Sequence, residues 1–457
     1  MLVMKFGGTS MEDAQAIDRV ASIVSSRLRQ KPAVVVSAMA RVTDQLLAIA
    51  RAAGAGDADE ALKISRELRE RHYHTAGELL GTGRFTEFHN QLESDFDALD
   101  ELLRGIAAVG EVSPRTADLV AAKGELLSSK IATAAFSARG LQATLVDARD
   151  CIITDDTYTR AIPFFEDTNE NLRSKVWPLV EDGRVPVLGG FIGSTRAGTT
   201  TTIGRGGSDF SAAILGAGLD AERIEIWTDV DGMMTTDPNL CPDAHRIKVL
   251  SFDEAAELAY FGAKVLHPAT LLPAVQKNIP VYILNSRNPS CEGTRVTAQA
   301  PRCRNLFKAI AAKKRITIID VAATRMLMAH GYLKSIFEAF DRHRVPVDVV
   351  STSEVSVSLT VDSNSAIPAL AADLAKLADV KYEGRKAIVC LIGESLRETA
   401  GVAARVFSVI PDVSIRMISQ GASEINLTFV IDEDAVPDVI RRLHAAFFSD
   451  LDREVFD

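Results

Sequence analysis

The stretch LVMKFGGTS, residues 2–10, joins a short apolar run to a glycine pair and two hydroxyl side chains. The apolar run Leu2–Phe6 predicts a buried β-strand. The glycines let backbone N–H groups approach an anion, and a helix that starts here adds a partial positive charge. Lys5 adds a full charge at the strand end. The stretch lacks the Walker A spacing, so it is interpreted either as an anion-binding turn or as a plain tight turn.

The chain continues outward from this stretch as alternating strands and helices. Further apolar runs predict buried strands at residues 33–37, 186–191, 224–230 and 279–284. Helical patterns occupy residues 11–30, 59–80, 85–108 and 115–139, with Ser10 and Asp13 resembling a capping box before the first of them. This alternation indicates a parallel sheet covered by helices on both faces. Such sheets bind ligands at the carboxyl ends of their strands.

Length and composition limit the class of protein. The 457 residues correspond to about three domains, and the net charge of −10 argues against nucleic acid or anionic membrane as a partner. No apolar run is long enough to span a membrane, and the N-terminus lacks a signal-peptide pattern. Five scattered cysteines without a C-x-x-C spacing fit a reduced compartment and no structural zinc. We expect a cytoplasmic, multi-domain enzyme.

A composition change at residues 287–305 predicts the end of the first domain, and a repeat follows it. Gly331, Phe337 and SEVSVSLTV (353–361) recur 70 residues later as Gly401, Phe407 and SEINLTFVI (423–431). Each copy reads as glycine, helix, strand, polar turn and strand. Two small α/β units in tandem after a large domain suggest ligand sensing, although a purely structural repeat is the alternative.

Three more motifs follow predicted strands or helices. TTTTIGRGGSD (199–209) places Arg205 and a glycine pair at a helix start, where they can hold a carboxylate or phosphate. WTDVDG (227–232) does not have the spacing of a calcium loop and instead offers Thr228 and Asp229 at a strand end. FGAKVLHP (261–268) contributes Lys264. Phosphoryl transfer depends mainly on positioning and charge stabilisation, so these motifs predict an ATP-dependent kinase acting on a small anion.

With KGELLS (123–128), FGAKVLHPATLLPAV (261–275) and TSEVSVSLT (352–360), these motifs resemble the aspartokinase family, in the family's order and over essentially the whole chain. The chain is most similar to the monofunctional, lysine-sensitive type. The resemblance implies an α/β fold in which an amino-acid-kinase-type, parallel-rich sheet sandwiched by helices precedes two ACT (βαββαβ) domains. The implied limits are 1–295 for the catalytic domain, 313–383 for the first ACT domain, and 303–312 with 384–457 for the second, whose opening strand is expected near 307–312.

The resemblance also implies the reaction and its residues. The ATP γ-phosphoryl group would be transferred to the side-chain carboxylate of L-aspartate, with Mg²⁺ held largely by phosphates and water rather than by a protein metal site. The implied catalytic residues are Lys5, Gly7, Gly8 and Asp209. Aspartate would be bound by Ser37, Thr43, Glu125, Arg205 and Ser208. ATP would be bound by Lys5, Phe6, Gly7, Gly8, Thr228, Asp229, Lys264 and Val265, with Gly7 and Gly8 donating backbone hydrogen bonds.

Regulation is implied by the first ACT domain. Its inhibitor-binding positions are Met326, Val347, Asp348, Thr352, Ser353 and Glu354. Lysine is the expected inhibitor and threonine the alternative, in a homodimer that pairs through ACT domains, with a larger assembly as the alternative to the dimer. The chain departs from residues common in relatives at Met234, Asn239, Met328 and Ala329.

Three alternatives compete with this assignment. A kinase of glutamate, acetylglutamate, carbamate or UMP is disfavoured by the repeat and by Glu125. A fused homoserine dehydrogenase would need chain beyond Asp457. A catalytically silent amino-acid sensor is disfavoured because Lys5, Arg205 and Asp209 are all retained.

Overall fold

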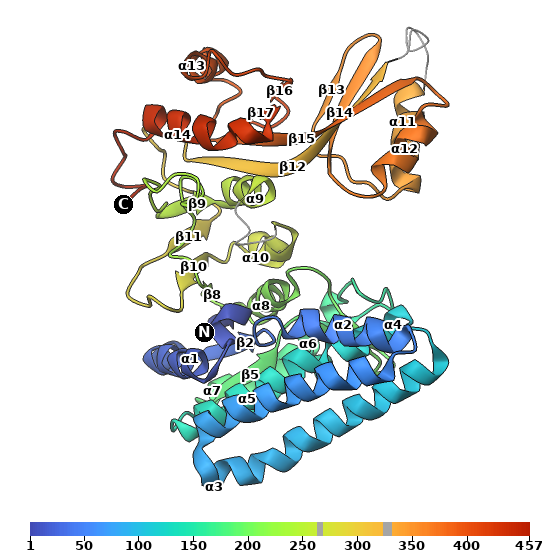
Figure 1. The fold of residues 1–457 in the computed structure, drawn as a ribbon. Coiled ribbons are helices and arrows are strands. Elements are labelled where there is room, and N and C mark those ends of the chain that lie inside the picture. Colours follow the sequence, from blue (N-terminus) through green and yellow to red (C-terminus); the bar gives the residue numbers. More distant parts are fainter. Residues whose placement is uncertain (263–267, 323–330) are drawn as a thin grey trace. The chain divides into compact units, whose positions relative to one another are not determined.

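The first predicted strand, β1 (Leu2–Phe6), lies inside an eight-stranded sheet in the computed structural model, which describes residues 1–262, 268–322 and 331–457 (Figure 1). The strand order is β3-β5-β2-β1-β8-β10-β11-β9. All pairings in it are parallel except β10 with β11. The other strands are β2 (Pro32–Val36), β3 (Ala143–Val146), β5 (Val185–Gly189), β8 (Arg223–Thr228), β9 (Val249–Ser251), β10 (Val281–Asn285) and β11 (Thr294–Thr297). The predicted strands are therefore confirmed, with ends shifted by at most two residues.

Contacts divide the described chain into two units. Unit 1 comprises Met1–Met233, Lys248–Phe252 and Val265–Ala300, and unit 2 comprises Met234–Ile247, Asp253–Lys264 and Pro301–Asp457. Strand β11 lies inside residues 287–305, the stretch that was predicted as a domain boundary. It belongs to the large sheet, because it pairs with β10 and β9. Among the described residues, no helix has both the length and the apolar character needed to cross a membrane.

Helices cover both faces of the large sheet. On one face α1, α2, α3 and α5 pack together, and on the other α8 packs on β1, β2 and β8 beside α6 and α10. The helices of unit 1 are α1 (Ala14–Ser26), α2 (Val42–Gly54), α3 (Ala58–Val109), α4 (Pro114–Ala121), α5 (Lys123–Ala138), α6 (Phe165–Lys175), α7 (Trp177–Glu181), α8 (Gly207–Gly218) and α10 (Leu272–Gln276). A small sheet of β4 (Ile153–Thr154), β6 (Ile192–Thr195) and β7 (Thr200–Thr202) adds a wall near α4.

The start of α1 differs from the prediction. The helix begins at Ala14, after a short 3-10 turn at Gly8–Met11, and Asp13 caps it by accepting from the Ala16 N–H at 2.8 Å. The predicted capping box with Ser10 is wrong. The Ser10 hydroxyl is instead 2.8 Å from the hydroxyl of Ser286, the residue after β10, so it links the turn after β1 to the end of β10.

The two helices predicted at 59–80 and 85–108 are the two arms of α3. Gly81 separates them, with φ 67° and ψ 170°, and the arms fold back on each other (Figure 1). The Ser65 hydroxyl donates to Asp100 at 2.6 Å, and Arg69 pairs with Asp100 at 2.9 Å. The stretch 115–139 likewise divides into α4 and α5.

Unit 2 contains a six-stranded antiparallel sheet in the order β13-β14-β12-β15-β17-β16. Its strands are β12 (Ala309–Ala322), β13 (Val350–Thr352), β14 (Ser356–Asp362), β15 (Asp379–Ile392), β16 (Met417–Gln420) and β17 (Asn426–Asp432). Its helices are α9 (Phe252–Phe261), α11 (Tyr332–Arg342), α12 (Ile367–Leu374), α13 (Val402–Val409) and α14 (Val436–Phe447). The predicted repeat is confirmed, since Gly331 and Gly401, both with positive φ, start α11 and α13 and each helix precedes a strand pair.

Two long strands run through both repeats. The first part of β12, 309–313, pairs with the last part of β15, whereas 316–322 pairs with both β14 and the start of β15. The register shifts between these parts, where Arg315 and Arg385 have positive φ. One repeat is thus inserted between the two halves of the other's strands.

Candidate active site

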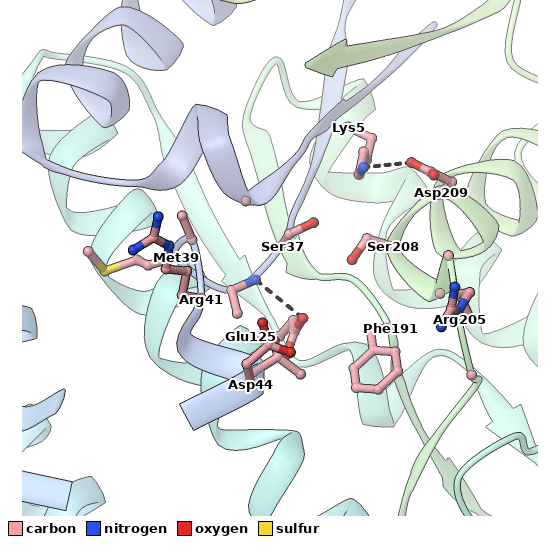
Figure 2. Close-up of a pocket in the computed structure, with 17 residues that line it drawn as sticks. Lys5, Ser37, Met39, Arg41, Asp44, Glu125, Phe191, Arg205, Ser208 and Asp209 are labelled. Atoms are coloured by element: carbon pink, nitrogen blue, oxygen red, sulfur yellow. Dashed lines mark hydrogen bonds and ion pairs between the residues drawn. The ribbon is translucent and has the colours of Figure 1, made fainter. Parts of the chain in front are cut away.

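Lys5 lies near the carboxyl end of β1 and points to Asp209 in the first turn of α8. The Lys5 Nζ is 2.6 Å from an Asp209 carboxylate oxygen, and both residues are buried (Figure 2). A buried lysine without a partner would cost several kcal/mol. The ion pair therefore fixes an ammonium group at the sheet edge where the strand-end motifs converge.

The start of α8 presents Arg205 and Ser208. Gly206 precedes the helix with φ 72°, a conformation that favours glycine. The helix start fits against the end of β5 because Gly190 has no side chain, and a Cβ there would lie 2.7 Å from the Ser208 Cβ. Glycines at both positions therefore let the first turn of α8 meet the sheet closely.

Glu125, in the first turn of α5, is a buried carboxylate. One oxygen, Oε1, accepts from the Ala38 N–H at 3.2 Å, while Oε2 is buried and has no hydrogen-bond partner among the described residues. Burial raises the pKa of Glu125 to about 8, although the bond from Ala38 lowers it in part. An oxygen of this kind lacks a cationic partner, which a ligand ammonium group would supply.

These groups share one cavity of about 330 Å³, the Lys5 cavity. It is lined by residues from the ends of β1 and β2, the first turns of α2, α5 and α8, and the loop before α8. Figure 2 shows the Lys5–Asp209 pair, Ser37, Ser208, Phe191 and Glu125 around the same space. Of the predicted residues, the cavity brings together Lys5, Gly8, Ser37, Thr43, Glu125, Arg205, Ser208 and Asp209.

Four predicted residues do not line the cavity. The Phe6 side chain is buried and stacks on Trp227 with a centroid distance of 6.0 Å, so it belongs to the core. The Gly7 N–H donates to the Trp227 carbonyl oxygen at 3.0 Å, which corrects the expectation that both glycines offer free donors. Thr228 is the last residue of β8, the neighbour of β1 in the sheet, and Asp229 is the next residue. Lys264 and Val265 lie outside the described residues.

Several lining residues were not predicted, among them Met39, Arg41, Asp44 and Phe191. Arg41 and Phe191 have positive φ, 67° and 65°, which is uncommon for residues other than glycine. Such conformations depend on tertiary packing and leave no trace in composition. The stretch SAMARVTD (37–44) directly follows a predicted strand, and this position could have pointed to more lining residues than Ser37 and Thr43, which the resemblance implied.

Asp118 of α4 is a further residue that the sequence did not reveal. It is buried and accepts hydrogen bonds from the Thr202 N–H at 2.9 Å, the Thr202 hydroxyl at 2.6 Å and the Thr159 N–H at 2.9 Å. Thr202 lies three residues before Arg205. Asp118 thus anchors the end of β7, from which the loop to α8 departs.

The predicted regulatory residues lie in unit 2, apart from Met326, which with Met328 and Ala329 is outside the described residues. Thr352, Ser353 and Glu354 are exposed around the turn from β13 to β14. The Asp348 carboxylate accepts from Tyr260 at 2.7 Å and from Lys313 at 2.8 Å, and its Oδ2 is buried with no partner among the described residues. Burial, then this bond to Asp348, raises the pKa of Tyr260.

The chain is similar to known proteins over 98% of its length. Residues 1–285 match the amino acid kinase family model and residues 389–447 match an ACT domain model. Lysine-sensitive aspartokinase 3 of Escherichia coli is 37% identical over 98% of this chain and 99% of its own length. The chloroplastic aspartokinase 2 of Arabidopsis thaliana is also 37% identical, over 98% of this chain and 84% of its own length.

Solved structures agree with these relatives. E. coli aspartokinase III in complex with aspartate and ADP superposes with a TM-score of 0.86 at 36% identity, covering 98% of this chain and all of that one. Its complex with lysine and aspartate gives a TM-score of 0.85 with the same identity and coverage. The chain therefore belongs to the amino acid kinase family and, within it, to the aspartokinases that carry C-terminal ACT domains.

Proposed function

We propose that this aspartokinase uses Mg²⁺–ATP, forms 4-phospho-L-aspartate in the Lys5 cavity, and is inhibited by lysine through its ACT domains. The observation that carries the substrate assignment is Glu125, whose buried Oε2 lacks a partner in a cavity that also holds Arg205 and the Lys5–Asp209 pair. An amino acid with an acidic side chain has one cationic and two anionic groups. The cavity offers groups of the opposite sign to each.

Glu125 would receive the ammonium group of aspartate, and Arg205 would pair with a carboxylate, helped by Ser37, Thr43 and Ser208. A side-chain carboxylate oxygen then attacks the γ-phosphorus of ATP. The bond from phosphorus to the β–γ bridging oxygen breaks, and ADP leaves with that electron pair. Because attacker and phosphates are both anionic, Lys5 lowers the barrier by offsetting their charge, and Asp209 holds Lys5 in place.

In this proposal Mg²⁺ arrives with the nucleotide, held by its phosphates and by water. Within the described residues, no group of three or more His, Cys, Asp or Glu side chains could hold a metal ion. Magnesium bound by phosphates and water needs no such protein site. Gly8, Thr228 and Asp229 remain our proposed contacts to the nucleotide, together with Lys264 and Val265.

The lysine assignment is supported by the E. coli relative, whose name states lysine sensitivity, and by the T-state complex of that protein with lysine. In this chain Asp348 Oδ2 is a buried acceptor without a partner among the described residues, beside the exposed turn of Thr352, Ser353 and Glu354. We propose that lysine binds there in a homodimer, and that the enzyme serves the biosynthesis of lysine, threonine and methionine.

The test is ADP release from ATP and L-aspartate, measured with and without Mg²⁺ and repeated with lysine, threonine or both. We expect turnover that needs aspartate and Mg²⁺ and falls when lysine is added. Turnover that falls with threonine alone would reassign the inhibitor. Turnover with glutamate but not aspartate would contradict the substrate assignment, and no turnover in folded protein would favour the sensor alternative.

A further inference from the structure

We propose that a second cavity, centred on Lys123, binds a small anion that carries phosphate or carboxylate oxygens. This Lys123 cavity measures about 200 Å³ and lies at the carboxyl ends of β3 and β5, against α5 and the second arm of α3. The carboxyl edge of a parallel sheet is where ligands of such folds bind. The site does not depend on the proposed reaction.

The side chains around this cavity are unusually rich in charge. Three cations and two anions line it, namely Lys123, Lys130, Arg149, Asp95 and Asp147. The Lys130 Nζ is 2.5 Å from an Asp95 oxygen. Arg149 donates to both oxygens of Asp147, at 3.0 Å and 2.6 Å. Both carboxylates therefore already have cationic partners.

Lys123 is the third cation of the cavity, and neither of the two carboxylates pairs with it. No ion pair or hydrogen bond of its ammonium group to another described residue is found, and the side chain is only partly exposed. Burial lowers the pKa of Lys123; Asp95 raises it in part, and Lys130 and Arg149 lower it further. The ammonium group thus sits among like charges with part of its hydration removed, and an anion in the cavity would relieve both costs.

The two carboxylates in the cavity do not neutralise Lys123, because each is already paired with another cation. Burial would raise the pKa of Asp147, but the hydrogen bonds from Arg149 outweigh it and lower the pKa, so Asp147 stays ionised and bound to Arg149. The cavity keeps an excess charge of one positive unit. This charge favours an anion over a cation as the occupant, and the cavity volume of about 200 Å³ limits the anion to a small one.

The Lys123 cavity is distinct from the Lys5 cavity. Lys123 and Glu125 belong to the same first turn of α5, two residues apart, yet each lines a different cavity, and the two sets of lining residues do not overlap. An anion bound by Lys123 would therefore lie behind the turn that positions Glu125, without competing for the proposed aspartate site.

The experiment is calorimetric titration of the full chain with inorganic phosphate and, separately, with malonate, at fixed ionic strength and without aspartate or ATP. Four proteins are compared: wild type, Lys123→Gln, Lys5→Gln and the control Lys277→Gln, whose lysine is exposed and paired with Asp220. We expect Lys123→Gln to weaken binding of one anion about tenfold or more, the usual cost of losing a charged hydrogen bond. The anion affected identifies the ligand chemistry.

Either of two results would overturn the proposal. One is that wild type binds neither anion; the other is that binding is lost in Lys5→Gln and kept in Lys123→Gln, which would place the anion in the Lys5 cavity. If Lys123→Gln does not fold, the site can be tested on the wild-type protein by chemical acetylation. Phosphate or malonate should slow acetylation of Lys123, read by mass spectrometry, and leave that of Lys277 unchanged. Equal rates with and without anion would also contradict the site.

Discussion

Lys5 is the residue whose charge matters most in the proposed reaction, and its burial and ion pair fix where that charge lies. Lys5 is 8% exposed and held by Asp209 at 2.6 Å, so its position is set before any ligand arrives. Preorganised charge of this kind stabilises a transition state more than a ground state.

Lys5→Ala should therefore lower kcat by about 100- to 1,000-fold, as loss of one well-placed stabilising group does, with a much smaller change in the aspartate KM. Steady-state kinetics with varied aspartate at saturating ATP measures both constants. The double variant Lys5→Ala/Asp209→Asn controls for the carboxylate left unpaired. A kcat equal to that of wild type would remove Lys5 from the mechanism.

Glu125 makes a pH-dependent prediction. Its pKa of about 8 means that the empty site is mostly protonated at pH 7, whereas an ammonium ligand requires the carboxylate. Binding of aspartate must then release a proton, so the aspartate KM should fall as the pH rises from 6 to 8. Titration calorimetry in buffers of different ionisation enthalpy counts the released proton directly.

Glu125→Gln is the matched control for this pH effect, because it keeps the shape and removes the titration. It should raise the aspartate KM by about 100-fold, since the substrate ammonium group loses a buried charged partner, and abolish proton release. Proton release that persists in Glu125→Gln would assign the titration to another group.

At the scale of elements, the loop between β7 and α8 is held by a residue far away in the sequence, Asp118 of α4. Asp118 holds Thr202 and Thr159 through four hydrogen bonds, although they lie 84 and 41 residues away in the chain. The anchor on Thr202 restrains the segment that carries Arg205.

Asp118→Asn replaces one acceptor oxygen by an NH₂ group that faces N–H and O–H donors. We expect the aspartate KM to rise about tenfold, matching the cost of a buried unsatisfied donor, with kcat changed less. Asp155→Asn is the control, since Asp155 accepts hydrogen bonds within the exposed turn before Ile162. Equal changes in kcat and KM would mean that Asp118 supports the fold rather than the position of Arg205.

The same elements show what the sequence could and could not predict. Lys5 and Arg205 were predicted because each lies in a short motif next to a strand or at a helix start, whereas Glu125 was predicted from the resemblance of KGELLS to the family. Asp118 was missed because its partners are remote, and the positive φ of Phe191 was missed because tertiary packing imposes it. Ser10 was misread because its hydroxyl bonds to Ser286, 276 residues away, instead of capping α1.

At the scale of the whole molecule, unit 2 depends on a buried charge cluster. Lys308 is fully buried and its Nζ lies 2.8 Å from Glu254 of α9 and 2.6 Å from Glu394. Burial would lower the pKa of Lys308, but the two carboxylates outweigh it and raise the pKa. The cluster links α9 to the residue just before β12, Lys308, and to Glu394 just after β15.

Lys308→Met should destabilise unit 2 by about 3–5 kcal/mol, because it removes a fully buried cation that pairs with two carboxylates, Glu254 and Glu394. Differential scanning calorimetry should show a lower unfolding temperature for unit 2. Lys334→Met, which removes an exposed lysine on α11, is the control and should leave the transition in place. An unchanged transition in Lys308→Met would show that the cluster is not needed for stability.

Regulation also belongs to the whole molecule. Glu354 is exposed beside the proposed inhibitor site and lies far from the Lys5 cavity in sequence. Glu354→Ala should weaken inhibition by lysine at least several-fold and leave the rate without lysine unchanged. Inhibition curves measured at fixed aspartate check both. A loss of the uninhibited rate would indicate a structural role for Glu354.

The shared strands of unit 2 have a consequence for how this protein can be rebuilt. Where β12 and β15 change register, Lys313 is opposite Ile388 and Ile316 is opposite Lys386, so the chain enters and leaves the inner repeat through neighbouring positions. We therefore expect that the inner repeat can be deleted, because a tight turn from Lys313 to Lys386 would join the two outer strands as a hairpin. The outer repeat has no such single exit, because its strands lie on both sides of the insertion.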